Sequence, residues 1–126
     1  MRVVERRMTL DECRNEHLQP YRKPCFWDTL DYEFLVANSV GHIVVLDLAG
    51  ALAGPESQEL YARIRQLVER GERMIVVNLW AVEKVDSEGL GELVRCLVTL
   101  KRIGGMMPLV NPPQHFRQLV ASMKFL

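Results

Sequence analysis

Ser87 is the side chain whose position most directly suggests chemistry. It lies in the stretch VDSEG, after the apolar run MIVVNLW and before a helical pattern. A serine at a strand-to-helix turn is typical of the hydrolase nucleophile elbow G-x-S-x-G, but Val85 replaces the first glycine. In that fold an acid and a histidine follow the serine, and here only His115, Glu88 and Glu92 do. The pattern argues against a catalytic serine and predicts that the protein is not an enzyme.

Two other chemistries are also disfavoured by spacing. The stretch GLGELV is a near miss for the dinucleotide fingerprint G-x-G-x-x-G, since Val94 stands at the third glycine. Asp86 and Glu88 would repel a pyrophosphate there, so we predict no cofactor. Near the N-terminus, three possible metal ligands lack a paired C-x-x-C and a fourth ligand, which predicts no metal site: Cys13, His17 and Cys25.

Ser87 also has a purely structural interpretation. Serine is a preferred N-cap residue, whose side-chain oxygen accepts a backbone N–H of the first helical turn and contributes about 1 kcal/mol. Glu88 would then complement the helix dipole. The local sequence leaves open whether Ser87 caps the helix or has a further function.

Length, composition and charge limit the class of protein. The 126 residues are the length of one domain, and 48% of them are hydrophobic, enough to form a core. Lys plus Arg and Asp plus Glu number 16 each, so no excess charge favours nucleic acid or a membrane surface. No stretch reaches the roughly 18 apolar residues of a membrane span, and the three widely spaced cysteines are typical of reduced thiols. These features predict a soluble cytoplasmic protein that does not insert into a membrane.

The chain divides into two parts at about residue 30. Residues 1–30 are dense in charge and contain two prolines, and we interpret them as an N-terminal appendage. Thr9 followed by Glu12 is a capping-box pattern that predicts one short helix, which Pro20 must end. Residues 31–126 have the regular periodicity of a single domain.

The domain is predicted to be α/β, with element order β-β-α-β-α-β-α. YEFLVANSV and HIVVLDL are predicted to form a hairpin. A helix follows Pro55, and Met74–Trp80 shows no alternation, as in an interior strand with Trp80 at the edge of the core. A second helix follows Ser87, and a last strand and helix surround Pro112. Strand–helix–strand units pair their strands in parallel, so we expect a mixed β-sheet covered by helices.

Residues 32–126 resemble the STAS domain, the fold of bacterial anti-sigma factor antagonists. Three stretches carry the resemblance: VVLDLAGAL, IVVNLWAVEKVDSEGLGEL and PLVNPPQHFRQLVASM. The family's D-S-S-G or D-S-T-G turn is present as Asp86-Ser87-Glu88-Gly89, with Glu88 in place of the usual Ser or Thr. The family's last strand and helix have no counterpart, and we expect them to be missing.

The resemblance implies a function in partner switching. In the family, the serine directly after the aspartate is phosphorylated by a cognate anti-sigma factor that is also a kinase, and Ser87 holds that position. It implies that an anti-sigma factor with serine kinase activity binds the turn and the loop after the second strand until Ser87 is phosphorylated. The residues implied in partner binding are Asp86, Ser87, Glu88, Gly89, Gly50, Ala53 and Gly54.

A second hypothesis stays open, namely a STAS adaptor without phosphorylation, such as the subunit that binds the ATPase of a lipid-transport ABC system. The loop Gly50-Ala51-Leu52-Ala53 lacks the acids of the family's G-E-L-D. Because no strand follows the last helix, we also expect the surface beside it to be covered. Either the N-terminal appendage, through Phe26 and Trp27, or a second copy in a homodimer would cover it.

Overall fold

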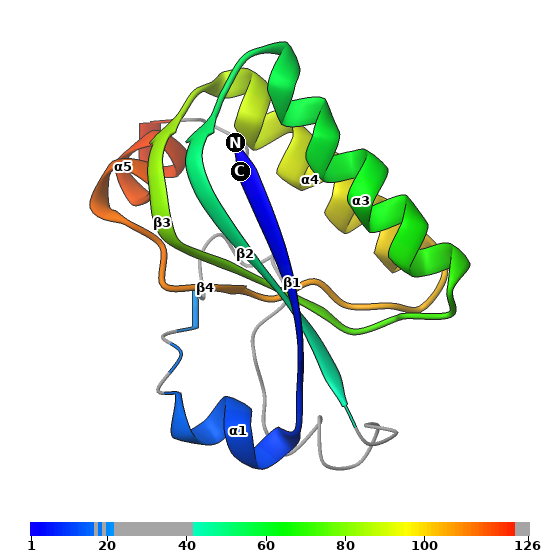
Figure 1. The fold of residues 1–126 in the computed structure, drawn as a ribbon. Helices are drawn as coiled ribbons and strands as arrows, with labels where there is room; N and C mark the ends of the chain where they lie inside the picture. The colour runs from blue at the N-terminus through cyan, green and yellow to red at the C-terminus, as the bar shows by residue number, and fades with distance from the viewer. Residues whose placement is uncertain (17, 19, 22–41, 123–126) are drawn as a thin grey trace.

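The computed structural model describes residues 1–16, 18, 20–21 and 42–122, which form a mixed sheet with helices (Figure 1). The strands are β1 (Arg2–Met8), β2 (Ile43–Leu52), β3 (Ile75–Val85) and β4 (Leu109–Val110), in the order β1-β2-β3-β4. β1 is antiparallel to β2, whereas β2, β3 and β4 are parallel. The predicted α/β class and mixed sheet are confirmed. From residue 43 onward, the order of strands and α-helices is also the predicted one.

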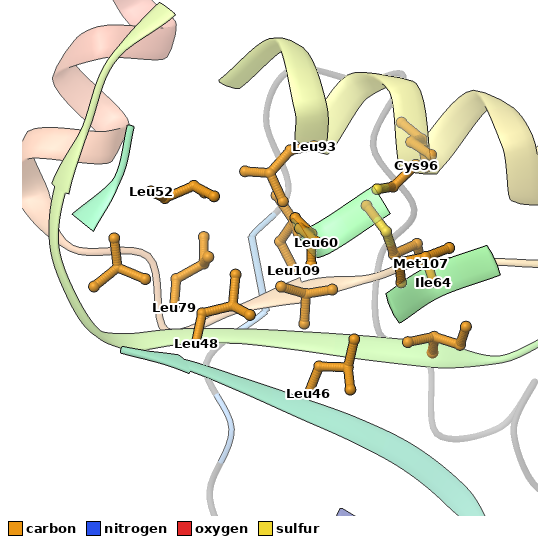
Figure 2. Packing of buried hydrophobic residues seen from close by; sticks show 14 of the residues in the cluster. Leu46, Leu48, Leu52, Leu60, Ile64, Leu79, Leu93, Cys96, Met107 and Leu109 are labelled. Atoms are coloured by element: carbon orange, nitrogen blue, oxygen red, sulfur yellow. The ribbon is translucent and has the colours of Figure 1, made fainter. Parts of the chain in front are cut away.

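The helices are α1 (Leu10–Asn15), α3 (Gln58–Glu69), α4 (Ser87–Arg102) and α5 (Gln114–Ser122). α3 and α4 lie side by side on one face of the sheet (Figure 1). Their buried residues follow helical spacing, with Leu60, Ile64 and Leu67 in α3 and Leu90, Leu93 and Leu97 in α4. Figure 2 shows Leu60 and Ile64 of α3 and Leu93 of α4 on the side of the sheet that carries Leu46, Leu48 and Leu79. None of the helices in the described ranges is long and apolar enough to cross a membrane.

β3 is an interior strand, as predicted, and its first part, Ile75–Val77, is buried on both faces. Ile75, Val77 and Leu79 pack against α3 and α4 in the main core. Val76 faces the other way, into a smaller cluster that includes Cys13 of α1. α1 begins with the predicted capping box of Thr9 and Glu12, so it is the short helix expected there. The two faces of the sheet are therefore covered by different parts of the chain.

β1 was not predicted. Arg2–Met8 do not belong to an appendage apart from the sheet, because they pair along β2 from Arg2 with Ala49 to Met8 with Ile43. The sequence assigned this place to residues 32–40, which lie outside the described residues, as do Phe26 and Trp27. β1 is an edge strand with charged residues on both faces, and its apolar pattern is correspondingly weak.

The prediction for Trp80 was wrong. β3 continues to Val85, and the Trp80 side chain is 78% exposed rather than at the edge of the core. Alternation from Val76 and Asn78 places Trp80 on the sheet face away from α3 and α4, beyond the part of that face that α1 covers. A β-bulge lies at the same place: Asp47 pairs with Asn78 and Ala49 with Ala81, so β3 has one residue more than β2 in this interval. The bulge puts Ala81 on the same face as Trp80, which the sequence of one strand does not reveal.

Candidate functional site

The candidate site is the turn that joins β3 to α4, and Asp86 organises it. Asp86 has extended backbone angles and is the N-cap of α4. Its Oδ1 accepts a hydrogen bond from the backbone N–H of Gly89 at 2.8 Å. Its Oδ2 accepts another from the N–H of Gly54, in the loop after β2, at 3.0 Å. One carboxylate thus caps the helix and ties the two loops of the site together.

Ser87 is the first residue of α4 and is exposed. It is not the N-cap, as one interpretation of the sequence had it, because Asp86 holds that position. Within the described part of the chain, the Ser87 hydroxyl has no hydrogen-bond partner, neither a backbone group nor a histidine. The hydroxyl therefore makes no contribution to the cap and is accessible to an incoming protein.

Gly89 is required by packing. A Cβ at Gly89 would stand 1.9 Å from the carbonyl oxygen of Leu52 and 2.7 Å from its carbonyl carbon. The first turn of α4 therefore sits directly on the end of β2, where no side chain fits. The backbone N–H of Asp86 also points to the Leu52 oxygen at 3.4 Å, which fixes the turn beside that strand end.

The loop that faces the turn is shorter than predicted. Gly50 and Ala51 belong to β2, with Gly50 at φ 86° opposite Val82 at a register shift. Only Ala53 and Gly54 lie in the loop itself, before a short 3-10 turn over Pro55–Ser57. Ser57 is buried, and its hydroxyl donates to the Gly54 carbonyl at 2.7 Å. The structure therefore brings Gly54 to the turn, whereas Gly50 lies further back in the sheet.

The turn carries negative charge before any modification. The backbone N–H groups of Gly89, above all, and of Gly54 and Glu88 hold the pKa of Asp86 below its ordinary value. Lys84 also lowers the pKa of Asp86, so this cation is close to the turn. Glu88, directly after Ser87, is exposed. The site is an exposed hydroxyl between two carboxylates at the N-terminus of a helix of 16 residues.

Cys96, on the buried side of α4, does not offer a nucleophile. Burial raises the pKa of its thiol to about 12, so it stays protonated at neutral pH. Among the residues that the structure describes, no cluster of three His, Cys, Asp or Glu side chains could hold a metal.

Comparison with known proteins identifies the kind of domain. Residues 36–125 match the family model described as "Mlab, STAS domain". A candidate anti-sigma factor antagonist from Bordetella bronchiseptica, BtrV, is 23% identical over 92 residues, which are 73% of this chain and 79% of that protein. β1 and α1 precede the residues that match the family model.

Two solved structures have a similar fold. The anti-sigma factor antagonist SpoIIAA in its unphosphorylated form superimposes with a TM-score of 0.54 at 25% identity, covering 63% of this chain and 73% of that chain. A crystal structure of Mglu gives a TM-score of 0.51 at 22% identity. It covers 56% of this chain but only 18% of that chain, so this likeness concerns the fold alone.

Proposed function

Because the chain belongs to the STAS domain family, we propose that it is a cytoplasmic partner-switching protein of the anti-sigma factor antagonist type. It binds an anti-sigma factor with serine kinase activity and is released when Ser87 is phosphorylated. It catalyses no reaction itself. The observation that supports this proposal is the Ser87 hydroxyl, which is exposed at the start of α4 and forms no hydrogen bond within the described part of the chain.

The structure can accommodate a phosphate on Ser87 without unfolding. A phosphate adds a charge of about −1.5 to −2, and the N-terminus of a helix stabilises negative charge. Asp86 already makes the capping hydrogen bonds, so the modification removes no cap. The domain should therefore keep its fold in both states.

Phosphorylation would weaken binding of the partner rather than unfold the domain. The turn already presents Asp86 and Glu88, and the phosphate would bring the local charge to three or more negative units. A partner docked over Gly54, Asp86 and Glu88 would lose packing and meet repulsion. A change of about 2–3 kcal/mol in binding free energy would weaken the affinity by about 30–150-fold.

The direct test is phosphorylation by an anti-sigma factor kinase encoded beside this gene. The purified protein is incubated with that kinase and ATP, and the intact mass and the peptide that contains Ser87 are measured. We expect one phosphate, located on Ser87 and absent from Ser87→Ala. If both proteins acquire phosphate equally, the switch is not at Ser87.

A second candidate is the STAS adaptor that works without phosphorylation, such as a subunit binding the ATPase of a lipid-transport ABC system. The exposed Glu88 favours it, since a fixed carboxylate already stands next to the serine. The matching family model is also named after Mlab rather than after an anti-sigma factor antagonist. Equal binding of a neighbouring ABC ATPase to the wild type, Ser87→Ala and Ser87→Asp would support the adaptor over the switch.

A further inference from the structure

Trp80 is an exposed tryptophan held in place by the fold. Its side chain is 78% exposed, more than any other large hydrophobic residue in the described part of the chain. It lies in the β-bulge of β3, where Leu79 and Trp80 occupy the interval that Leu48 alone fills in β2. Its backbone N–H donates to Oδ1 of Asn78 at 3.1 Å, which closes the bulge. The exposure of Trp80 is thus built into the strand and does not result from a loose loop.

A chain of polar side chains crosses the sheet beneath the bulge. Arg6 of β1 contacts the Asp47 carboxylate through Nε and donates to Oδ1 from Nη2 at 2.9 Å. Asn78 Nδ2 also donates to Asp47 Oδ1, at 2.8 Å. Asn111, after β4, donates from Nδ2 to Asn78 Oδ1 at 3.0 Å. These contacts join all the strands of the described sheet and fix Asn78, on which the bulge depends.

Trp80 faces away from α3 and α4. Its neighbours Leu79 and Val82 are buried in the core beneath those helices, whereas Trp80 and Ala81 are exposed. Cross-strand partners share a face, so Ala81, Ala49 and Arg2 form one row across β3, β2 and β1. Val4, which is 43% exposed, lies one pair back in β1, opposite Asp47.

This surface has a defined boundary. α1 covers the same face nearer the start of β2, where Cys13 packs with Val45 and Val76. The next pair of residues, Asp47 and Asn78, already belongs to the polar chain described above. We call the uncovered part the Trp80 face; its residues are Arg2, Val4, Ala49, Trp80, Ala81 and Lys84.

The Trp80 face by itself is too small to be the whole interface of a stable dimer. A tryptophan side chain offers about 150–250 Å² of contact area, and Val4 and the two alanines add little. A stable protein–protein interface buries about 800 Å² on each partner. The Trp80 face by itself therefore fits a short segment that inserts one or two side chains.

The charges on the face indicate which segment it would bind. Arg2 and Lys84 are exposed, and neither forms an ion pair with another described residue. Lys84 pairs with Ala51 across the strands and therefore lies on this face. The carboxylate of Asp47 is already paired with Arg6. Glu83, the residue before Lys84 in β3, is an exposed carboxylate. Arg2 and Lys84, which also lies close enough to Asp86 to lower its pKa, complement a segment that carries acids.

We propose that the Trp80 face binds a short protein segment in which an aromatic or large aliphatic side chain is flanked by carboxylates. The apolar side chain packs on Trp80 over Ala49 and Ala81, and the carboxylates meet Arg2 and Lys84. This binding does not require phosphorylation of Ser87.

The test uses a random twelve-residue peptide library displayed on phage and selected against the full chain. The selected peptides are synthesised, together with matched versions in which every Asp or Glu is replaced by Asn or Gln. Binding is titrated through the fluorescence of Trp80 in a Trp27→Phe background, where Trp80 is the only tryptophan, since the chain has two. Trp80→Ala, Trp80→Phe and Arg2→Ala/Lys84→Ala are compared by calorimetry.

We expect the selected peptides to combine an apolar anchor with acids, and to shift the Trp80 emission to shorter wavelength. Trp80→Ala should weaken binding by about tenfold or more, Trp80→Phe less, and loss of the two cations by severalfold. Two variants serve as controls and should bind normally: Ser87→Ala, and Val98→Ala, which removes a 41% exposed apolar residue of α4. Circular dichroism establishes that each variant is folded.

Four results would overturn the proposal. The selected peptides could bind Trp80→Ala as tightly as they bind the wild type. The substitutions Val98→Ala or Ser87→Ala could also weaken peptide binding as much as Trp80→Ala does. The acid-free peptides could bind equally well. Finally, vesicles of phosphatidylglycerol could shift the Trp80 emission while the peptides do not, which would assign the face to a lipid surface.

Discussion

The Asp86 carboxylate accepts a hydrogen bond from the backbone N–H of Gly54 at 3.0 Å, across 32 positions in the sequence. The same carboxylate caps α4 through Gly89. The aspartate before the serine is therefore part of the architecture of the turn, and it sets the position at which Ser87 is presented. Loss of Asp86 should affect stability and recognition together, whereas loss of the Ser87 hydroxyl should affect recognition alone.

Asp86→Ala should lower the free energy of unfolding by about 1–2 kcal/mol, because it removes an N-cap and leaves the Gly54 donor unpaired. Urea denaturation measures the change. Ser87→Ala, at the next position, is the matched control and should change stability by less than about 0.5 kcal/mol. A Ser87→Ala variant as unstable as Asp86→Ala would show that the serine is the cap.

The capping interaction should also depend on pH. In the folded state the pKa of Asp86 is lower than in the unfolded state. The charged carboxylate therefore stabilises the fold fully at pH values above the unfolded-state pKa. This contribution is lost as the pH falls through the lowered, folded-state pKa. The difference in stability between the wild type and Asp86→Asn should therefore shrink on acidification from neutral pH, as urea titrations at several pH values would measure. A difference that grew on acidification would contradict the assignment.

Gly89→Ala should be strongly destabilising, by about 2 kcal/mol or more, because the new Cβ would overlap the Leu52 carbonyl at 1.9 Å. Gly91 provides a matched control in the same helix, since a Cβ there meets nothing within 4 Å. Gly91→Ala should stabilise the protein by up to about 1 kcal/mol. The thermal unfolding midpoints of the two variants are measured and compared. Equal changes for Gly89→Ala and Gly91→Ala would contradict the packing described for α4.

The phosphoswitch predicts an ordered series at Ser87. Ser87→Ala should bind the anti-sigma factor normally but become insensitive to ATP. Ser87→Asp adds only one of the two charges of a phosphate and should weaken binding partially. Glu88→Ser should be phosphorylated as fast as the wild type or faster. Calorimetric titrations measure the affinities. Equal binding of the wild type and Ser87→Asp, with no phosphate on Ser87, would leave the turn as a docking surface only.

Deleting residues 1–8 should destabilise the protein and promote self-association. The deletion removes β1 and exposes the edge of β2, including the backbone groups that now pair from Ile43 to Ala49. Light scattering after size exclusion and urea denaturation would measure both effects. A deletion variant that stays monomeric with unchanged stability would show that β1 contributes nothing to the sheet in solution.

Much of the fold follows from patterns within single segments. The apolar stripes of α3 and α4 and the continuous apolar run of β3 predict those elements, because burial of one helix face or of both strand faces selects the residues locally. The turn at Ser87 follows from the same patterns, since it must lie between β3 and α4. β1 was not predicted because an edge strand contains few buried apolar residues. Its place beside β2 also depends on pairing with residues about 40 positions away in the sequence.

Only the tertiary structure decided how the side chains of the site are used. Asp86 and Ser87 both have side chains that can cap a helix. In the structure Asp86 is the N-cap, and its carboxylate also accepts a hydrogen bond from the backbone of Gly54. The requirement for Gly89 comes from the carbonyl of Leu52, a residue of another strand. The exposure of Trp80 depends on how far α1 extends over its face of the sheet, which the sequence of one strand cannot specify. Periodicity is a property of one segment, whereas caps, close approaches and bulges arise from two segments in contact.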